Sequence, residues 1–84
     1  MKIRKEDYQV LKKAMEKTLK DNNTTIEKVL KHYVDNNIGK DHKKRAIWDI
    51  VHASNLTRFI CDNLYKYCYD SHIETAIYKI ANEI

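Results

Sequence analysis

The feature that most limits the fold of this chain is its shortage of turn-forming residues, with one glycine and no proline among 84 residues. β-Sandwiches and barrels join many short strands through turns rich in these two residues, so the composition argues against both. Residues 65–69 alternate with the period of a strand, but no other segment alternates and could pair with them. We interpret them as the end of a helix before a turn at Asp70, and we predict an all-α protein.

Apolar residues recur at helical spacing along almost the whole chain, which predicts four or five amphipathic helices. The length is about half the ~150 residues taken as one domain. We therefore predict one compact, bundle-like helical domain over residues 1–84. The side chains predicted to face the core are Tyr8, Leu11, Met15, Thr18 and Leu19; Ile26, Val29, Leu30, Tyr33 and Val34; Ile47, Trp48, Ile50 and Val51; Leu56, Phe59, Ile60, Leu64 and Tyr67; and Ile73, Ala76, Ile77, Ile80, Ala81 and Ile84.

Short motifs predict where several helices begin and end. Residues 24–27 and 71–74 each match a capping box, in which a threonine or serine caps the helix and a glutamate three residues on reaches back. Gly39 is predicted to supply the positive φ that ends the second helix. Asp41 is predicted to cap the third helix.

The densest charge cluster lies at the start of the predicted third helix. Cations are unfavourable there because a helix N-terminus already carries partial positive charge. Together with free backbone N–H groups, the cluster is a candidate seat for phosphate or for an acidic protein surface. The alternative is a solvated face, partly neutralised by Asp41 and Asp49. The cluster contains Lys40, His42, Lys43, Lys44 and Arg45.

The second and third helices, with their short turn at residues 37–40, have the layout of a helix-turn-helix. Such a motif needs a small residue where the helices cross, and Tyr33, Val34 and Asp35 are poor choices. Asp49 on the third helix would also repel DNA phosphates, although an acid can read a cytosine edge. These residues disfavour sequence-specific DNA reading.

Six tyrosines and one tryptophan exceed what the apolar stripes need. Tyr65, Tyr69 and Tyr78 are predicted to point outward, where aromatic rings are enriched among binding hot spots. Alternatively, each ring lies flat over a thin core with its hydroxyl in water. The candidate partner-binding residues are therefore Lys40, Lys43, Lys44, Arg45, Tyr65, Tyr69 and Tyr78.

The sequence predicts no catalytic, metal or cofactor site. Cys61 and Cys68 would lie ~10.5 Å apart along a helix, too far for a disulfide, and both are predicted to be buried free thiols. Cys68 and His72 have a spacing seen in zinc sites, but no second ligand pair accompanies them. No nucleophile–base pair, phosphate loop or carboxylate dyad is present. We therefore predict that the chain is not an enzyme.

The chain is predicted to be a cytoplasmic, reduced protein. Its net charge is +4, and no apolar run approaches the ~18 residues of a membrane span. The first seven residues lack the apolar core of a secretion signal. Two cysteines are too few for a disulfide scaffold.

Three blocks, at residues 7–11, 45–51 and 70–77, form a recognisable series. They are an Asp-Tyr opening, an Arg-x-x-Trp-Asp block and an Asp-x-His-Ile-x-Thr-Ala block. In this respect the chain resembles a family of small accessory proteins of tailed bacteriophages and prophages. The resemblance implies a phage-encoded protein in the bacterial cytoplasm and supplies no catalytic residue.

By analogy in size and style, such a protein binds a host complex, as anti-CRISPR inhibitors do. Because the chain is basic, we expect it to bind an acidic effector surface or a protein–nucleic-acid junction and not to mimic DNA. The alternative is a basic nucleic-acid-binding accessory protein that uses Lys40, Lys43, Lys44 and Arg45.

The recurring blocks also have a structural interpretation. Arg45 and Asp49 are four residues apart on one helix, and His72 and Thr75 lie in the first turn of the last. If these helices pack side by side, the four residues form a polar latch between them.

Overall fold

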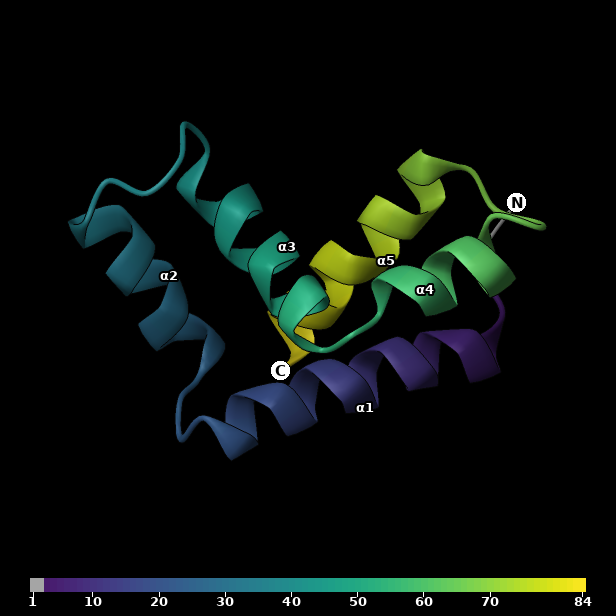
Figure 1. Ribbon diagram of the computed structural model, residues 1–84, viewed down its shortest axis with the longest axis horizontal. Helices are drawn as coiled ribbons and strands as arrows, with labels where there is room; N and C mark the ends of the chain where they lie inside the picture. Colours follow the sequence, from purple (N-terminus) through teal and green to yellow (C-terminus); the bar gives the residue numbers. More distant parts are fainter. Residues whose placement is uncertain (1–2) are drawn as a thin grey trace.

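The computed structural model describes residues 3–84, and over that range the chain forms helices and no strand (Figure 1). The helices are α1 (Lys5–Asp21), α2 (Ile26–Asp35), α3 (His42–Ala53), α4 (Thr57–Phe59), its π-helical continuation η1 (Ile60–Leu64), and α5 (Asp70–Glu83). The prediction of a compact all-α fold is confirmed for these residues.

The longest helix, α1, runs along one side of the molecule, and α3, α4 and α5 lie above it (Figure 1). α1 packs against both α3 and α5, and α3 also packs against α5. α2 packs against α3 and lies at one end of the molecule, away from α5. α1, α3 and α5 therefore contact one another around the core, to which η1 adds Ile60 and Leu64, and α2 packs on α3 and adds Ile26.

The apolar stripes fill one continuous core, as their spacing predicts. Leu11, Met15 and Leu19 come from α1, and the fully buried Leu64 closes the core from η1. Val34 was predicted to face inward, but its side chain is 58 % exposed. Because α2 has α3 on one side only, the buried part of its stripe is narrow and leaves Val34 outside.

Of the three helix starts for which the sequence predicted a cap, one is confirmed and two differ. The Asp41 carboxylate accepts a hydrogen bond from the Lys44 N–H (3.1 Å), so Asp41 caps α3 as predicted. In α2 the cap is Thr25, whose hydroxyl accepts from the Lys28 N–H (3.3 Å). A lysine thus stands where a capping box needs an acid, and the predicted box over residues 24–27 is wrong.

The second predicted capping box is also wrong, because α5 begins at Asp70, one residue before Ser71. Ser71 therefore lies inside the helix, where its carbonyl accepts a hydrogen bond from the Thr75 hydroxyl (2.8 Å). The residue that precedes the helix is Tyr69, whose side chain makes no capping bond.

Three asparagines end helices in the way that glycine usually does. Asn23, Asn37 and Asn55 have φ values of 51°, 51° and 58°, and each directly follows the last turn of α1, α2 or α3. At each position the chain closes two backbone bonds typical of the Schellman motif; after α2, the Ile38 N–H donates to the Tyr33 carbonyl (2.9 Å). Asparagine suits this role because its short polar side chain tolerates the left-handed region.

Gly39 was predicted to end α2, but Asn37 does so. Gly39 has a φ of 75° two residues later, in the turn that leads into α3. A Cβ atom on Gly39 would lie 3.2 Å from the Cβ of Arg45. Glycine is therefore needed to let the turn return close to the first turn of α3.

The predicted fourth helix is shorter than its apolar stripe suggests. It ends at Leu64, and its last turn is a π-turn in which the Tyr65 N–H donates to the Ile60 carbonyl (3.0 Å). Cys68 is buried as predicted, but Cys61 is exposed, so the prediction for Cys61 is wrong. Cys61 directly follows the buried Ile60 and points away from the core side of this turn.

Candidate interaction surface

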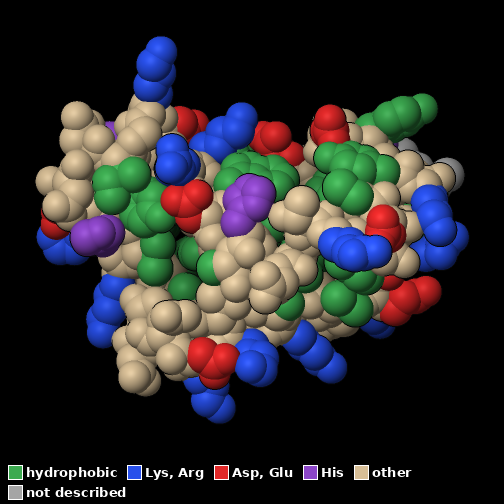
Figure 2. Space-filling view, in the orientation of Figure 1, with side chains coloured by type: hydrophobic (Ala, Val, Ile, Leu, Met, Phe, Trp, Pro, Cys, Tyr) green, Lys and Arg blue, Asp and Glu red, His purple; other side chains and the backbone are tan. Residues whose placement is uncertain are grey.

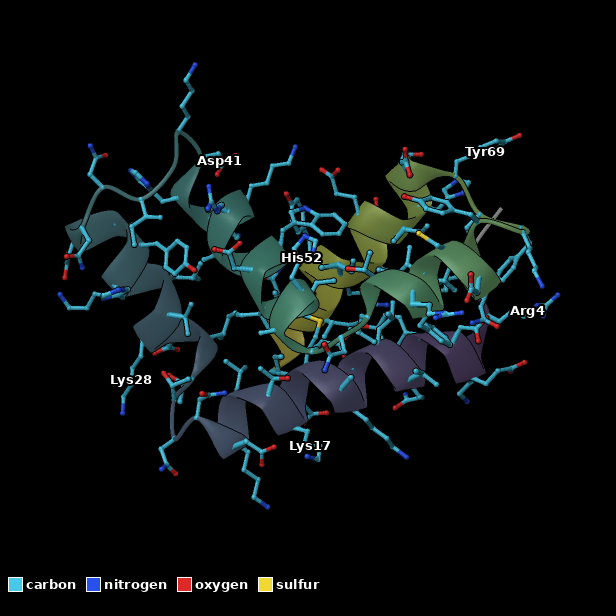
Figure 3. The ribbon with its side chains drawn as sticks, viewed as in Figure 1. Arg4, Lys17, Lys28, Asp41, His52 and Tyr69 are labelled. Atoms are coloured by element: carbon cyan, nitrogen blue, oxygen red, sulfur yellow. The ribbon has the colours of Figure 1, made fainter. Side chains whose placement is uncertain are left out.

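The basic cluster projects from the turn before α3 and from the first turn of that helix. Lys40, Lys43, Lys44 and Arg45 are all exposed. Figure 3 marks this place by Asp41, which lies where the turn enters α3. Within residues 3–84, none of the three lysines forms an ion pair, so their charges face solvent.

Arg45 differs from these lysines because it belongs to a polar link. Its Nε donates to both carboxylate oxygens of Asp49, at 3.2 and 3.3 Å. The Tyr33 hydroxyl of α2 donates to the same carboxylate (2.6 Å). This hydrogen bond, followed by burial and by the charge of Asp49, raises the pKa of Tyr33.

The polar link corrects the predicted latch. The Arg45–Asp49 pair is present, but the helix that it engages is α2, through Tyr33. The Thr75 hydroxyl donates within α5, and His72 lines a different groove from Asp49. The Asp49 side of α3 faces Tyr33 of α2, whereas the part of α3 that adjoins the start of α5 is the face with Lys44 and Trp48.

Trp48 lies between the basic cluster and Tyr65, one of the tyrosines predicted to point outward. Its half-buried ring lines three adjoining shallow grooves. The first contains Lys40, Lys44 and Arg45, and the second, of about 400 Å³, contains Lys44 and Tyr65. We call the surface around this ring the Trp48 face; its charged and aromatic residues are Lys40, Asp41, Lys44, Arg45, Trp48, Tyr65, Asp70 and Glu74.

Of the three tyrosines predicted to point outward, two do so. Tyr65 is 50 % exposed and Tyr69 is 75 % exposed, and Figure 3 shows Tyr69 projecting from the loop between η1 and α5. Tyr78 is half-buried and packs against the core, so the outward prediction is wrong for this residue. It lies next to the buried Ile77, where the apolar stripe of α5 is broad enough to include it.

Tyr65 interacts with Asp70, the first residue of α5. A hydrogen bond from its hydroxyl to the Asp70 carboxylate is the first cause that raises the pKa of Tyr65; burial and the charge of Asp70 add to it. Tyr69 contacts the His72 ring instead, with centroids 5.9 Å apart.

The fold thus brings together only part of the predicted site. Lys40, Lys44, Arg45 and Tyr65 meet on the Trp48 face, whereas Lys43, Tyr69 and Tyr78 line none of its three grooves. Trp48 was predicted to face the core, but its half-buried ring also lines these grooves. A signal was available, since Trp48 follows Lys44 by four residues and such residues share one helix face.

The Trp48 face carries both signs of charge. Cations gather at the start of α3, and Asp70 and Glu74 lie at the start of α5. Figure 2 shows hydrophobic side chains exposed over α3 and α4, with positive and negative groups between them. This arrangement can recognise a surface that is apolar in the middle and carries opposite charges at its two ends.

Other classes of site find little support in the described chain. Residues 3–84 contain no group of three or more histidine, cysteine, aspartate or glutamate side chains placed to hold a metal ion. Nor does any helix in this range have the length and apolar character needed to cross a membrane.

Comparison with known proteins adds no relative to this description. No protein-family model matches the chain, and no curated protein or solved structure shows significant similarity to it.

Proposed function

We propose that this chain is a non-enzymatic interaction protein that binds another protein through the Trp48 face. The observation that carries the proposal is the position of Trp48, half-buried between exposed cations and the exposed Tyr65. Tryptophan, tyrosine and arginine are the residue types most enriched among binding hot spots. An aromatic ring already fixed in a helix loses little conformational entropy on binding.

A protein partner suits this face better than nucleic acid does. Asp70 and Glu74 line the same groove as Lys44 and Tyr65. Two carboxylates at this place would repel the phosphates of a nucleic acid, whose binding depends on neutralising many of them. A protein surface can set acids against Lys40 and Lys44 and a basic group against Asp70.

Nucleic-acid binding is the second candidate, favoured by a different observation. Lys40, Lys43 and Lys44 are exposed at a helix N-terminus and form no ion pair within residues 3–84, and backbone N–H groups at such a terminus favour anions. Binding of this kind would weaken steeply with salt, roughly in proportion to the number of phosphate contacts.

The resemblance to phage accessory proteins suggests the kind of partner. On that basis the partner is a host protein or ribonucleoprotein complex in the bacterial cytoplasm, and the chain inhibits or redirects it. A CRISPR effector complex is the case that the analogy favours.

The test is affinity capture from defence-competent host cells with a charge-reversed variant. We expect Lys40→Glu/Lys44→Glu to reduce capture of the partner at least about tenfold, because rim charges set partner choice and association rate. Arg45 is left unchanged, since its replacement would also break the link to Asp49. Thermal melting should be unaffected or slightly raised, because acids suit a helix N-terminus.

The matched control is Lys13→Glu/Lys20→Glu, which makes the same change of charge on exposed residues of α1. The control should retain the partner. Equal capture by both double variants and the parent chain would contradict the proposal. Retention on DNA that falls steeply between 50 and 200 mM salt, with no captured protein, would favour the second candidate.

A further inference from the structure

A separate groove lies between the start of α1 and residues 72–79 of α5, and it shares no lining residue with the Trp48 face. Its volume is about 530 Å³. Its apolar surface comes from Ile3, the Tyr8 ring and Ala76. This volume lies within the range of about 300–1,000 Å³ that is typical of small-molecule sites.

Among residues 3–84, the ionisable side chains that line this groove are all basic apart from the Tyr8 phenol. Lys5, Lys79 and His72 line it, and no carboxylate does. Within residues 3–84 neither lysine forms an ion pair. The Lys79 ammonium instead lies 5.7 Å from the centre of the Tyr8 ring.

Asp7 near the start of α1 and Glu83 at the end of α5 make contacts with other residues. Asp7 accepts a hydrogen bond from the Tyr67 hydroxyl. Glu83 accepts from the Tyr8 hydroxyl and pairs with the Lys12 ammonium (3.1 Å). Hydrogen bonds from Tyr8 and Lys12 are the main causes that lower the pKa of Glu83, and the charge of Lys79 adds to them, so Glu83 balances part of the Lys79 charge. Within residues 3–84 Lys5 forms no ion pair.

We propose that this groove binds a small amphipathic anion, with a flat apolar body on the surface formed by Ile3, Tyr8 and Ala76 and a carboxylate at the rim near Lys5 and Lys79. The groove has the volume of a small-molecule site, which favours such a ligand. The inference is independent of the function proposed for the Trp48 face.

The probe is 2-naphthoate, compared with the uncharged 2-naphthalenemethanol in ¹⁵N NMR titrations of the full chain. We expect naphthoate to bind with a dissociation constant of roughly 0.1–1 mM, as its size allows. It should bind about fivefold more tightly than the alcohol, because it gains two solvent-exposed charge contacts. The largest shifts should occur at the amides of Lys5, Tyr8, Ala76 and Lys79.

Two variants locate the effect. Lys5→Gln/Lys79→Gln should abolish the preference for the anion and leave binding of the alcohol unchanged. Thr75→Trp places a large ring in the groove and should abolish binding of both probes. The control Lys13→Gln/Lys20→Gln removes the same charge elsewhere on α1 and should bind like the parent chain.

The proposal is overturned by equal affinity of the parent chain for the two probes, by shifts that map outside the groove, or by no shift up to 10 mM probe. If Thr75→Trp fails to fold, which its NMR spectrum will reveal, the glutamine variant still decides. Retention of the anion preference by Lys5→Gln/Lys79→Gln would also overturn it.

Discussion

The helices α2 and α5 show how differently two amphipathic segments of one chain can be anchored. α2 has the more strongly amphipathic sequence, yet it buries only Ile26, whereas α5 buries five side chains. α5 packs against both α1 and α3, and α2 against α3. Amphipathicity therefore shows which face of a helix is apolar, while the number of neighbours decides how much of that face leaves water.

The polar contacts that hold α2 also differ from those that hold α5. The α2 side is held by the link from Tyr33 to Asp49. At the other end, Tyr67 donates to Asp7 and also accepts from the Arg4 N–H (3.1 Å), and Tyr8 donates to Glu83. These contacts connect α1 to the segment before α5 and to the last turn of α5. Stability is therefore concentrated in α1, α3 and α5, and α2 is expected to open more readily.

The largest expected loss of stability comes from truncating buried side chains of the core. Ile77 and Leu64 are fully buried, and replacing either by alanine should destabilise the protein by about 2–5 kcal/mol. Val29→Ala on the half-buried face of α2 should cost about 1 kcal/mol or less, because less surface is lost from a packed environment. Urea midpoints of the three variants measure the contrast. Equal midpoints for Ile77→Ala and Val29→Ala would mean that α2 is as firmly anchored as α5.

A smaller effect is expected in alkali, where the tyrosine contacts of α1 are lost. Burial, followed by the hydrogen bonds to Glu83 and Asp7, raises the pKa of Tyr8 and of Tyr67 from 10.0 to about 12. A folded-state pKa above the unfolded value gives stability that is complete below pH 10 and is lost as the pH rises towards 12. After allowance for solvent screening, we expect each tyrosine to account for about 1 kcal/mol of this loss.

The double variant Tyr8→Phe/Tyr67→Phe checks the alkaline effect. It should be less stable than the parent chain at pH 8, because it lacks both hydrogen bonds, but its stability should fall less between pH 10 and 12. Tyr69→Phe, at an exposed ring, serves as the control and should follow the parent profile. A double variant with the parent's full alkaline loss would show that these two tyrosines do not hold α1 in place.

The smallest expected change in stability separates Lys12 from Lys79, although the sequence pattern places both on the polar side of a helix. Lys12 lies on the polar side of the α1 stripe, but its side chain is only 27 % exposed and pairs with Glu83. Lys12→Ala should cost about 0.5–1 kcal/mol, and Lys79→Ala, at an exposed position, should stay within about 0.5 kcal/mol of the parent. Denaturation in 0.5 M salt should reduce the difference through screening. No difference at low salt would mean that the Lys12–Glu83 pair adds nothing to the joining of α1 and α5.

The local features of this fold were accessible from the sequence because they depend on residues close together in the chain. Helical spacing identified the buried side chains of α1 and α5, and Asp41 was recognisable as a cap because it lies next to the helix that it serves. The sequence pattern indicated only some of the helix ends that are formed by asparagine. Asn23 and Asn55 lie at breaks in the apolar pattern. For α2, Gly39 was predicted to end the helix, but the residue that ends it is Asn37, two positions earlier.

The tertiary structure decided which side chains are exposed and which residues come together in the Trp48 face. Val34 is exposed and Tyr78 is half-buried because the neighbours of a helix, and not its own periodicity, set the width of the face that is covered. The Trp48 face exists only because α3, η1 and the start of α5 meet around one ring. In this protein the sequence alone determined which segments are helical and which side of each is apolar, since both follow from contacts three or four residues apart. Tertiary packing decided which polar and aromatic groups share a surface, since those groups are separated along the chain and meet only once the core has formed.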